Sequence, residues 1–294
     1  MTGMNKTSLL LLAACMLCGT GFGQGIERRR AGLDPRNYPN GTAILNDGEL
    51  QYLGLSLLRA DTIDTVRHTV EYGFSYPDRD EPDPMLLEIG DSLTAFYSRR
   101  AMADDSLYTA TLRQNRPRRV QTTAPGWRLY GRIGSRSVEQ VHRIPFHEET
   151  VTVGETLPLE WRIDTLRQTV LGFVCYRATT RYGGREWQAW FAPEIPIPAG
   201  PWKLGGLPGL ILCAHDAEGL FSFRCRSIAT AKRPLLRYAW RTRPMRREEW
   251  LAFERRMHET PHALFGNHTH IISQKKHGRQ DERWQVAYRP LELE

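Results

Sequence analysis

The sequence predicts a mainly β fold, either an antiparallel curved sheet or an open half-barrel, with a few short helices. Apolar and polar side chains alternate throughout Thr65–Tyr76, which is typical of a strand with one buried and one solvated face. Gly183-Gly184 separates two stretches rich in β-branched and aromatic residues, which predicts a hairpin with a primed turn. Helical spacing is confined to two short segments, so the helices are expected to be few.

The N-terminal segment has the form of a secretory signal. Lys6 precedes an apolar run from Leu9 to Leu17, and small residues then lead to Gly23. This run is too short for a membrane span with those flanks. We therefore expect residues 1–23 to be a cleaved signal peptide and the mature chain to reach the periplasm or the outside of the cell. Leu12-Ala13-Ala14-Cys15 also fits a bacterial lipobox, so lipid anchoring at Cys15 is the alternative.

The remainder is expected to be a flexible N-terminal arm, residues 24–46, and a single β-rich domain, residues 47–294. No later apolar run approaches the ~20 residues of a spanning helix, so the mature chain is not expected to be transmembrane. The net charge of +7 is concentrated in a few basic runs. In an exported protein such runs favour a solvated surface or contact with anionic envelope components, and no nucleic-acid partner is expected.

The elements before the hairpin follow from short periodic runs. After the strand Thr65–Tyr76 comes a short apolar strand, Met85–Ile89, and weak helical spacing then predicts a helix over Ser98–Gln114. The basic segment Asn115–Pro125 is expected to be a linker. Four further β runs are predicted at Trp127–Ile133, Val138–Ile144, Val151–Val153 and Leu159–Ile163.

The second half of the chain is predicted to contain two hairpins and one helix. The first hairpin joins Thr169–Tyr182 to Arg185–Phe191, and the second turns at Asp216–Gly219. Its strands are Leu210–His215 and Leu220–Ile228, and a further strand is expected at Leu235–Arg241. Beyond them Trp250, Phe253 and Met257 recur at helical spacing, which indicates core packing, and Pro261 ends that helix. One or two β segments should follow, including Trp284–Tyr288.

Three cysteines follow the leader, an odd number for an oxidising compartment. At least one of Cys175, Cys213 and Cys225 must therefore stay free or pair with another molecule. A four-residue turn at Asp216–Gly219 would place Cys213 opposite position 222 and Cys225 opposite position 210. The two thiols would then point to opposite faces of the hairpin, and a disulfide between them would need a bulge.

The stretch Trp187–Cys213 concentrates aromatic, proline and glycine residues more densely than any other part of the chain. Polar groups at the rim of such an apolar segment are typical of a binding site. The candidate binding residues are Arg185, Trp187, Trp190, Glu194, Trp202 and Lys203. The competing interpretation, which we favour, is that Arg185 and Glu194 pair or cap backbone groups where proline has removed donors.

The sequence supports catalytic residues less well than it supports binding residues. Gly90-Asp91-Ser92-Leu93 matches the nucleophile block of the GDSL esterases, but neither the later Gly-x-Asn-Asp nor the Asp-x-x-His of those enzymes occurs. A surface metal site is also conceivable, although Pro261 interrupts the helical spacing of the first histidine pair. Its candidate ligands are His258, His262, His268 and His270. We assign no catalytic residue and expect no cofactor.

The run Gly206, Leu207, Pro208, Gly209, Leu210 and Ile211 resembles the signature of the GLPGLI family of secreted Bacteroidetes proteins. The flanking Trp187–Trp190, Pro193–Pro196 and Gly200–Lys203 are similar to the residues that precede that signature. The resemblance implies a secreted or envelope protein and brings no established activity or cofactor. We therefore expect an envelope-associated, non-enzymatic binding module for an apolar ligand or a partner protein. The alternative is an envelope hydrolase that uses Ser92 or a histidine-bound metal.

Overall fold

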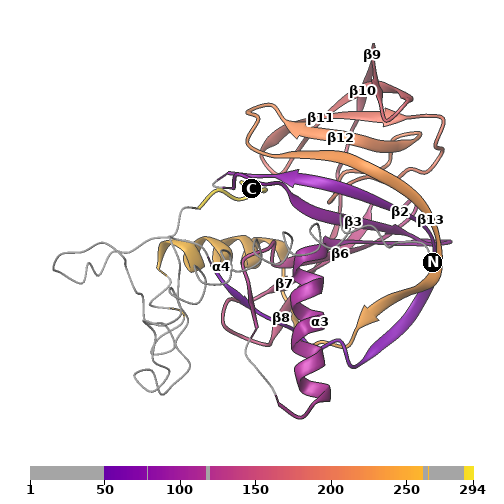
Figure 1. Ribbon diagram of the computed structural model, residues 1–294. Coiled ribbons are helices and arrows are strands. Elements are labelled where there is room, and N and C mark those ends of the chain that lie inside the picture. The colour runs from indigo at the N-terminus through magenta and orange to yellow at the C-terminus, as the bar shows by residue number, and fades with distance from the viewer. Residues whose placement is uncertain (1–49, 78, 117–119, 261–263, 265–287) are drawn as a thin grey trace, which may run out of the picture. The chain divides into compact units, whose positions relative to one another are not determined.

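The computed structural model describes residues 50–77, 79–116, 120–260, 264 and 288–294, all of which belong to one compact unit. Its main feature is an open twelve-stranded sheet (Figure 1). In spatial order its strands are β14 (Thr242–Pro244), β8 (Thr150–Thr156), β7 (Ser137–Arg143), β6 (Trp127–Arg132), β4 (Leu93–Ser98), β3 (Asp83–Ile89), β2 (Ala60–Ser75), β13 (Ser222–Tyr238), β12 (Leu210–Asp216), β11 (Arg185–Ala192), β10 (Phe173–Tyr182) and β9 (Arg162–Val170). The prediction of a mainly β fold is confirmed.

The sheet is mixed only at one edge. Every neighbouring pair of strands is antiparallel except β14 and β8, which run parallel. Two short strands, β1 (Tyr52–Leu53) and β5 (Gln121–Thr122), form a separate antiparallel pair. The segment expected to be a basic linker therefore contains β5.

Local signals place several elements correctly. Helix α3 (Arg99–Arg113) begins after Ser98, whose hydroxyl accepts a hydrogen bond from the Ala101 N–H, and Gln114 is its C-cap. The hairpin turn at Gly183-Gly184 has φ of 59° and 73°, the positive values that a primed turn requires. Helix α4 (Arg247–Glu259) buries Trp250 and Met257, so the aromatic stripe does pack into a core.

The strand predicted over Thr169–Tyr182 is wrong because a tight turn divides it. Leu171 and Gly172 have φ of 50° and 86°, and they separate β9 from β10. The predicted strand Leu159–Ile163 is also displaced, since β9 begins at Arg162. Valine and threonine on both sides of the turn continue the β pattern, and Leu171 is an uncommon residue at a left-handed position, so composition conceals the break.

Two further predictions concern β13 and are corrected. The strands expected at Leu220–Ile228 and Leu235–Arg241 are one long strand that is paired with β2 and interrupted by bulges. In the second hairpin Cys213 lies opposite Arg224 rather than position 222, a register shift of two residues. That shift keeps the alternation of faces, and Cys175, Cys213 and Cys225 are all free and buried.

One face of the sheet carries the main hydrophobic core. The 193–209 segment joins the adjacent strands β11 and β12 and folds over this face instead of crossing the sheet, with Trp202, Leu204 and Leu207 buried in the core. Leu210 and Leu212 are also buried. The hydroxyl of Tyr72 on β2 donates to the Ile211 carbonyl at 2.7 Å, which ties the signature to the centre of the sheet.

Helix α3 contacts β3 and β4 and packs toward the opposite face. Its Asp105 is fully buried and accepts two hydrogen bonds from the guanidinium of Arg143 on β7, at 2.9 and 2.5 Å. A third hydrogen bond comes from the Leu55 N–H at 2.7 Å. Such a bidentate, hydrogen-bonded pair compensates the cost of burying both charges.

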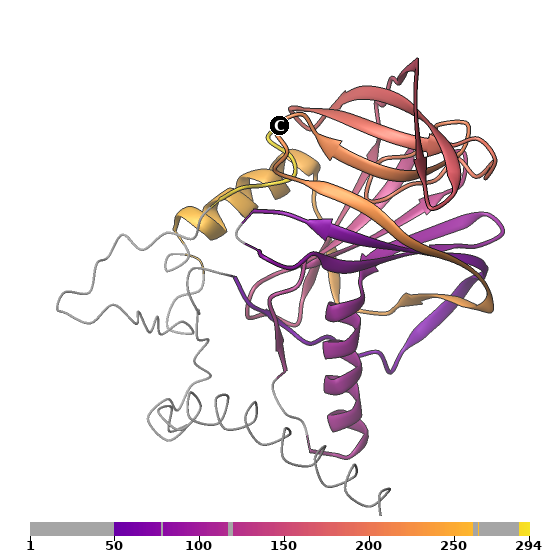
Figure 2. The ribbon, with the colours of Figure 1, turned by 45° about the horizontal axis from the view of Figure 1, so that its top comes forward.

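Helix α4 packs on the main-core side of β7 and β8, and Figure 2 shows the C-terminal segment beside it. No helix in the described part of the chain combines the length and the apolar character needed to cross a membrane. The predicted leader, the N-terminal arm and the tail strand up to residue 287 lie outside the described residues.

Candidate ligand-binding site

The sheet, α4 and the C-terminal segment line a cavity of about 640 Å³. Its floor consists of residues from β2, β6 and β7 that share one face of the sheet, because Trp127 lies opposite His142 in the β6–β7 register. Described lining residues are Leu50, Tyr52, Phe74, Tyr76, Pro77, Arg79, Thr123, Ala124, Pro125, Gly126, Trp127, Gln140, His142, Trp202, Phe221, Trp250, Leu251, Glu254, His258, Tyr288, Arg289, Pro290, Leu291 and Glu292.

Helical periodicity explains which side chains α4 contributes. Trp250, Glu254 and His258 are four residues apart and Leu251 is adjacent to the first, so one stripe of the helix lines the cavity. Trp250 stacks on the His142 ring with centroids 4.0 Å apart and an interplanar angle of 28°. This contact joins the helix to the cavity floor.

Aromatic rings make up much of the remaining wall. Phe74 stacks on Tyr76 at 4.9 Å and contacts Trp127 edge-on at 6.3 Å. Phe221 is also stacked against Phe74, with ring centroids 6.3 Å apart. Interlocked rings of this kind have few alternative rotamers, so this wall is largely preformed for a ligand.

Two buried polar atoms at the cavity have no hydrogen-bond partner among the described residues. They are Oε1 of Gln140, a residue only 3% exposed, and Nε1 of Trp202, a residue 5% exposed. Trp202 also has φ of 53°, an uncommon conformation for a bulky residue. Buried donors and acceptors without a partner cost about 1–3 kcal/mol each, so these two atoms lower the stability of the fold beside the cavity.

Burial shifts the pKa values of Glu254 and His142 in the cavity. Desolvation, with a smaller contribution from the nearby Glu292 carboxylate, raises the pKa of Glu254 to about 7. Desolvation and the positive charge of Lys203 hold the pKa of His142 well below its ordinary value. Near neutral pH the cavity therefore contains a neutral imidazole and a carboxyl group that is partly protonated.

A buried charge network fixes the C-terminal wall of the cavity. The ammonium of Lys203 contacts the carboxylates of both Glu155 and Glu292. Arg247 at the start of α4 donates to Glu292 Oε2 at 2.6 Å. The Leu293 N–H donates to the Gly183 carbonyl at 2.8 Å, so the hairpin turn holds the same segment.

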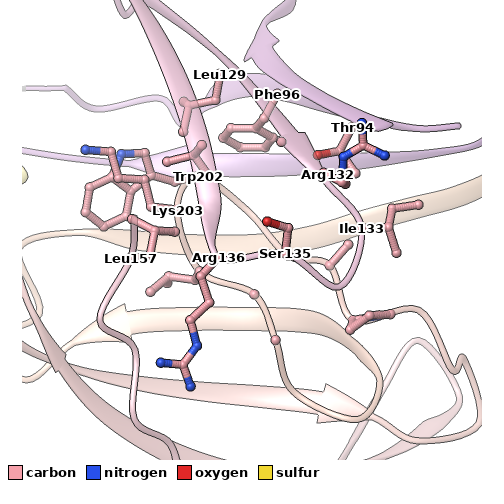
Figure 3. A pocket seen from close by; sticks show the side chains of 18 of the residues that line it. Thr94, Phe96, Leu129, Arg132, Ile133, Ser135, Arg136, Leu157, Trp202 and Lys203 are labelled. Atoms are coloured by element: carbon pink, nitrogen blue, oxygen red, sulfur yellow. The ribbon is translucent and has the colours of Figure 1, made fainter. Parts of the chain in front are cut away.

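A second, smaller cavity of about 120 Å³ lies between the sheet and the loop that joins β11 to β12 (Figure 3). Phe96 and Leu129 face it from the sheet, and Trp202 and Lys203 face it from the loop. Trp202 lines both cavities. The small volume has room for a few waters and not for a drug-sized ligand, so we take the larger cavity as the candidate site.

The structure disperses the binding residues predicted from sequence. Trp202 is the one of the six that lines the larger cavity. Trp187 is fully buried in the core, whereas Trp190 is half-buried and Glu194 is exposed. Lys203 belongs to the charge network described above.

Arg185 is buried and has structural partners. It pairs with Asp216 at 3.1 Å and with Glu218 at 3.3 Å, and it donates to the carbonyls of Pro290 and Leu291. The backbone-capping interpretation of this residue therefore agrees with the geometry. The acidic partners of Arg185 are Asp216 and Glu218, and Glu194 is not among them.

Neither catalytic candidate is assembled among the described residues. Ser92 is exposed at the β3–β4 turn, and its hydroxyl lies 3.4 Å from the carboxylate of Asp64, which also accepts the Ser92 and Leu93 N–H groups. That pattern is a turn-capping arrangement. Of the four histidine candidates, His258 lines the larger cavity, while His262, His268 and His270 lie outside the described residues. The described part of the chain brings together no three metal-ligating side chains.

Sequence reasoning missed Glu254, Gln140, His142 and Tyr52. The helical stripe that identified Trp250 as a core residue would have included Glu254 one turn later, so a signal for that position existed. Gln140 and His142 interrupt the expected β run at alternate positions, and a polar pair on a buried face is such a signal as well. Tyr52 carries none.

Comparison with known proteins adds a family of unknown function. The family model described as "Protein of unknown function (Porph_ging)" matches residues 183–213, which run from the hairpin turn through the signature to β12. The chain is therefore similar to an uncharacterised family over this short region, and the GLPGLI assignment stays a prediction. No curated protein matches the chain.

Among solved structures, two of PNGF-II, in space groups P21 and C2, resemble this fold with a TM-score of 0.45 and 13% identity. Each match covers 64% of this chain and 32% of the other protein, so the chain spans about a third of that protein's length.

Proposed function

We propose that this chain is an exported binding module that holds a small, predominantly aromatic or aliphatic ligand in the 640 Å³ cavity. The observation that carries the proposal is a cavity of about 640 Å³ walled by stacked aromatic rings, with the Glu254 carboxyl group among its lining residues. Ligand sites of this type are concave, mostly apolar and equipped with a few polar groups that fix orientation.

The size of the cavity supports a small ligand over a peptide or a protein partner. Sites for drug-sized molecules have volumes of roughly 300–1,000 Å³. A cavity of about 640 Å³ lies in the middle of that range.

The chemistry of the lining favours binding over covalent catalysis. The described lining residues include neither serine nor cysteine. Export is proposed on the pattern of residues 1–23, a single lysine followed by an apolar run and small residues. N-terminal sequencing of the protein from its native cells tests this part: a mature chain beginning at Gln24 supports it, and retention of Met1 contradicts it.

The binding proposal is tested with the neutral fluorescent probe N-phenyl-1-naphthylamine, whose emission rises in apolar surroundings. We expect saturable binding to one site. Leu251→Trp adds an indole to the cavity lining and should weaken the probe's affinity at least about tenfold by filling the volume that the probe needs.

The matched control is Leu107→Trp, because Leu107 is 57% exposed on α3 and does not line the cavity. This variant should bind as the parent does. Circular dichroism and thermal unfolding establish that both variants fold. Unchanged affinity in a folded Leu251→Trp protein, or equal loss in both variants, would contradict the proposal.

A further inference from the structure

We propose that the cavity selects organic ammonium ligands and that the carboxylate of Glu254 is the counter-ion for their charge. This inference rests on the proposed binding function and adds the chemical class of the ligand. The juxtaposition that carries it is a carboxyl group without a basic partner in a cavity walled by aromatic rings.

Glu254 differs from the buried acids of the described chain in lacking a basic partner. Each buried acid has an ion pair: Asp83 with Arg100, Glu88 with Arg128 and Arg233, Asp105 with Arg143, Asp216 with Arg185, and Glu292 with Lys203 and Arg247. The half-buried Glu254 has no salt bridge within the described residues, and its hydrogen bond comes from the neutral Tyr288 hydroxyl at 3.4 Å. A desolvated carboxylate without a cation is costly, and a cationic ligand would remove that cost.

The aromatic rings around the cavity fit the same ligand. Tyr52, Tyr76, Trp127, Trp250 and Tyr288 all line it, and the faces of such rings attract ammonium groups by about 0.5–2 kcal/mol each. Aromatic faces and a carboxylate are together the lining that suits an arylalkyl ammonium.

The strongly basic side chains near the cavity are engaged with other groups or are exposed at the surface. Arg79 donates to the Thr123 carbonyl at 2.8 Å and lies 5.9 Å from the centre of the Tyr76 ring. Arg289 is exposed. Lys203 is the cation whose field reaches Glu254, and it is held between Glu155 and Glu292. The cavity therefore matches a cationic ligand better than an anionic one.

The experiment uses three indole ligands with the same ring and different end groups: tryptamine, tryptophol and indole-3-propionate. Isothermal titration calorimetry at pH 8 should give tryptamine at least about tenfold higher affinity than tryptophol, and the carboxylate the lowest affinity. In Glu254→Gln, tryptamine and tryptophol should bind within about threefold of each other, and circular dichroism establishes that this variant folds.

A pH series gives a second readout. Ionisation of a carboxyl group with a pKa of about 7 should strengthen tryptamine binding by about tenfold between pH 6 and pH 8. Glu254→Gln should abolish this dependence.

Other titratable or charged groups also face Glu254. Tyr288 and Glu292 belong to the C-terminal segment, and Lys203 belongs to the loop between β11 and β12. Tyr52 and His142 line the same cavity, and His258 lies on the same helix. The control His258→Asn should keep the dependence if Glu254 is its source.

Each outcome decides one of the two proposals. Equal affinity for tryptamine and tryptophol in the parent protein, or tightest binding of the propionate, overturns the ammonium assignment while binding of the neutral probe leaves the cavity function standing. A preference for tryptamine that survives in Glu254→Gln overturns the role of Glu254. Failure of all three indoles and of the neutral probe removes the proposed function as well.

Discussion

Lys203 and Glu292 form a buried ion pair that joins the loop between β11 and β12 to the C-terminal segment. Glu155 on β8 shares the same ammonium, and Arg247 on α4 binds the other carboxylate oxygen of Glu292. One cluster of charges thus connects a loop, a strand, a helix and the C-terminal segment. The wall of the large cavity depends on it, because Glu292 and its neighbours line that wall.

Lys203→Met should therefore destabilise the fold strongly. The substitution leaves the carboxylates of Glu155 and Glu292 buried with a single remaining cation, Arg247, and removal of one partner of a buried pair costs about 3–5 kcal/mol. Urea unfolding followed by tryptophan fluorescence measures the change. Arg67→Met is the control: it breaks the exposed pair with Asp91 and should cost no more than about 1 kcal/mol. Equal losses in the two variants would show that the buried network does not stabilise the fold.

Gly209 is expected to tolerate no side chain. A Cβ at this position would lie 2.3 Å from the Ala192 carbonyl oxygen, and this backbone cannot move aside without disturbing β11. Gly209→Ala should cost about 1–3 kcal/mol, and Gly209→Val more. Gly205→Ala, in the same loop, meets nothing closer than 3.4 Å and should be neutral or slightly stabilising. A Gly209→Ala protein with the parent's melting temperature would contradict the close approach.

Glu254→Gln should stabilise the ligand-free protein at high pH. Because folding raises the pKa of this carboxyl from 4.5 to about 7, the folded state keeps a proton that the unfolded state releases between those values. The parent therefore loses stability as the pH rises from 4.5 to 7, and glutamine does not. The difference between the two proteins should be absent below pH 4.5 and reach at most about 3 kcal/mol above pH 7. Melting curves across this range measure it, and a constant difference would argue against titration of Glu254.

The three buried thiols should be unreactive until the protein unfolds. Burial raises the pKa of Cys225 to about 12 and that of Cys175 to about 11, and it also raises the pKa of Cys213. At pH 8 the thiolate fraction of Cys225 falls by about a thousandfold relative to an exposed cysteine, and the thiolate is the reactive form. Iodoacetamide labelling followed by peptide mass spectrometry should find these sites labelled in guanidinium chloride and unlabelled without it. Rapid labelling of native Cys225 would contradict its burial.

Turn and cap residues in the sequence correctly predicted the elements whose ends depend on those residues alone. Gly183-Gly184 supplies two positive φ angles in succession, and Ser98 supplies a helix cap, so the hairpin and α3 lie where they were expected. The turn at Leu171-Gly172 was missed because leucine rarely adopts the positive φ that Leu171 has here. The bulges in β13 were missed because the partner strand β2 decides where the extra residues lie.

The cavity could not be predicted from any one stretch of sequence. Its lining joins Phe74, Trp127, His142, Trp250 and Leu291, which come from five separate parts of the chain. The sequence did direct attention to Trp202, on grounds of aromatic density, and that residue does reach the cavity wall. The site is recognisable by a ring-walled cavity and by a carboxyl group without an ion pair among the described residues, and both properties depend on tertiary packing.

The chain order gives the Lys203 cluster a consequence for folding. Glu292 follows Lys203 by 89 residues, so Lys203 and Glu155 can pair with each other before the C-terminal segment is in place. Until Glu292 joins them, the wall that contains it does not exist and the aromatic floor stays exposed. We therefore expect a chain that lacks its C-terminal segment to expose an apolar surface and to bind a holding chaperone.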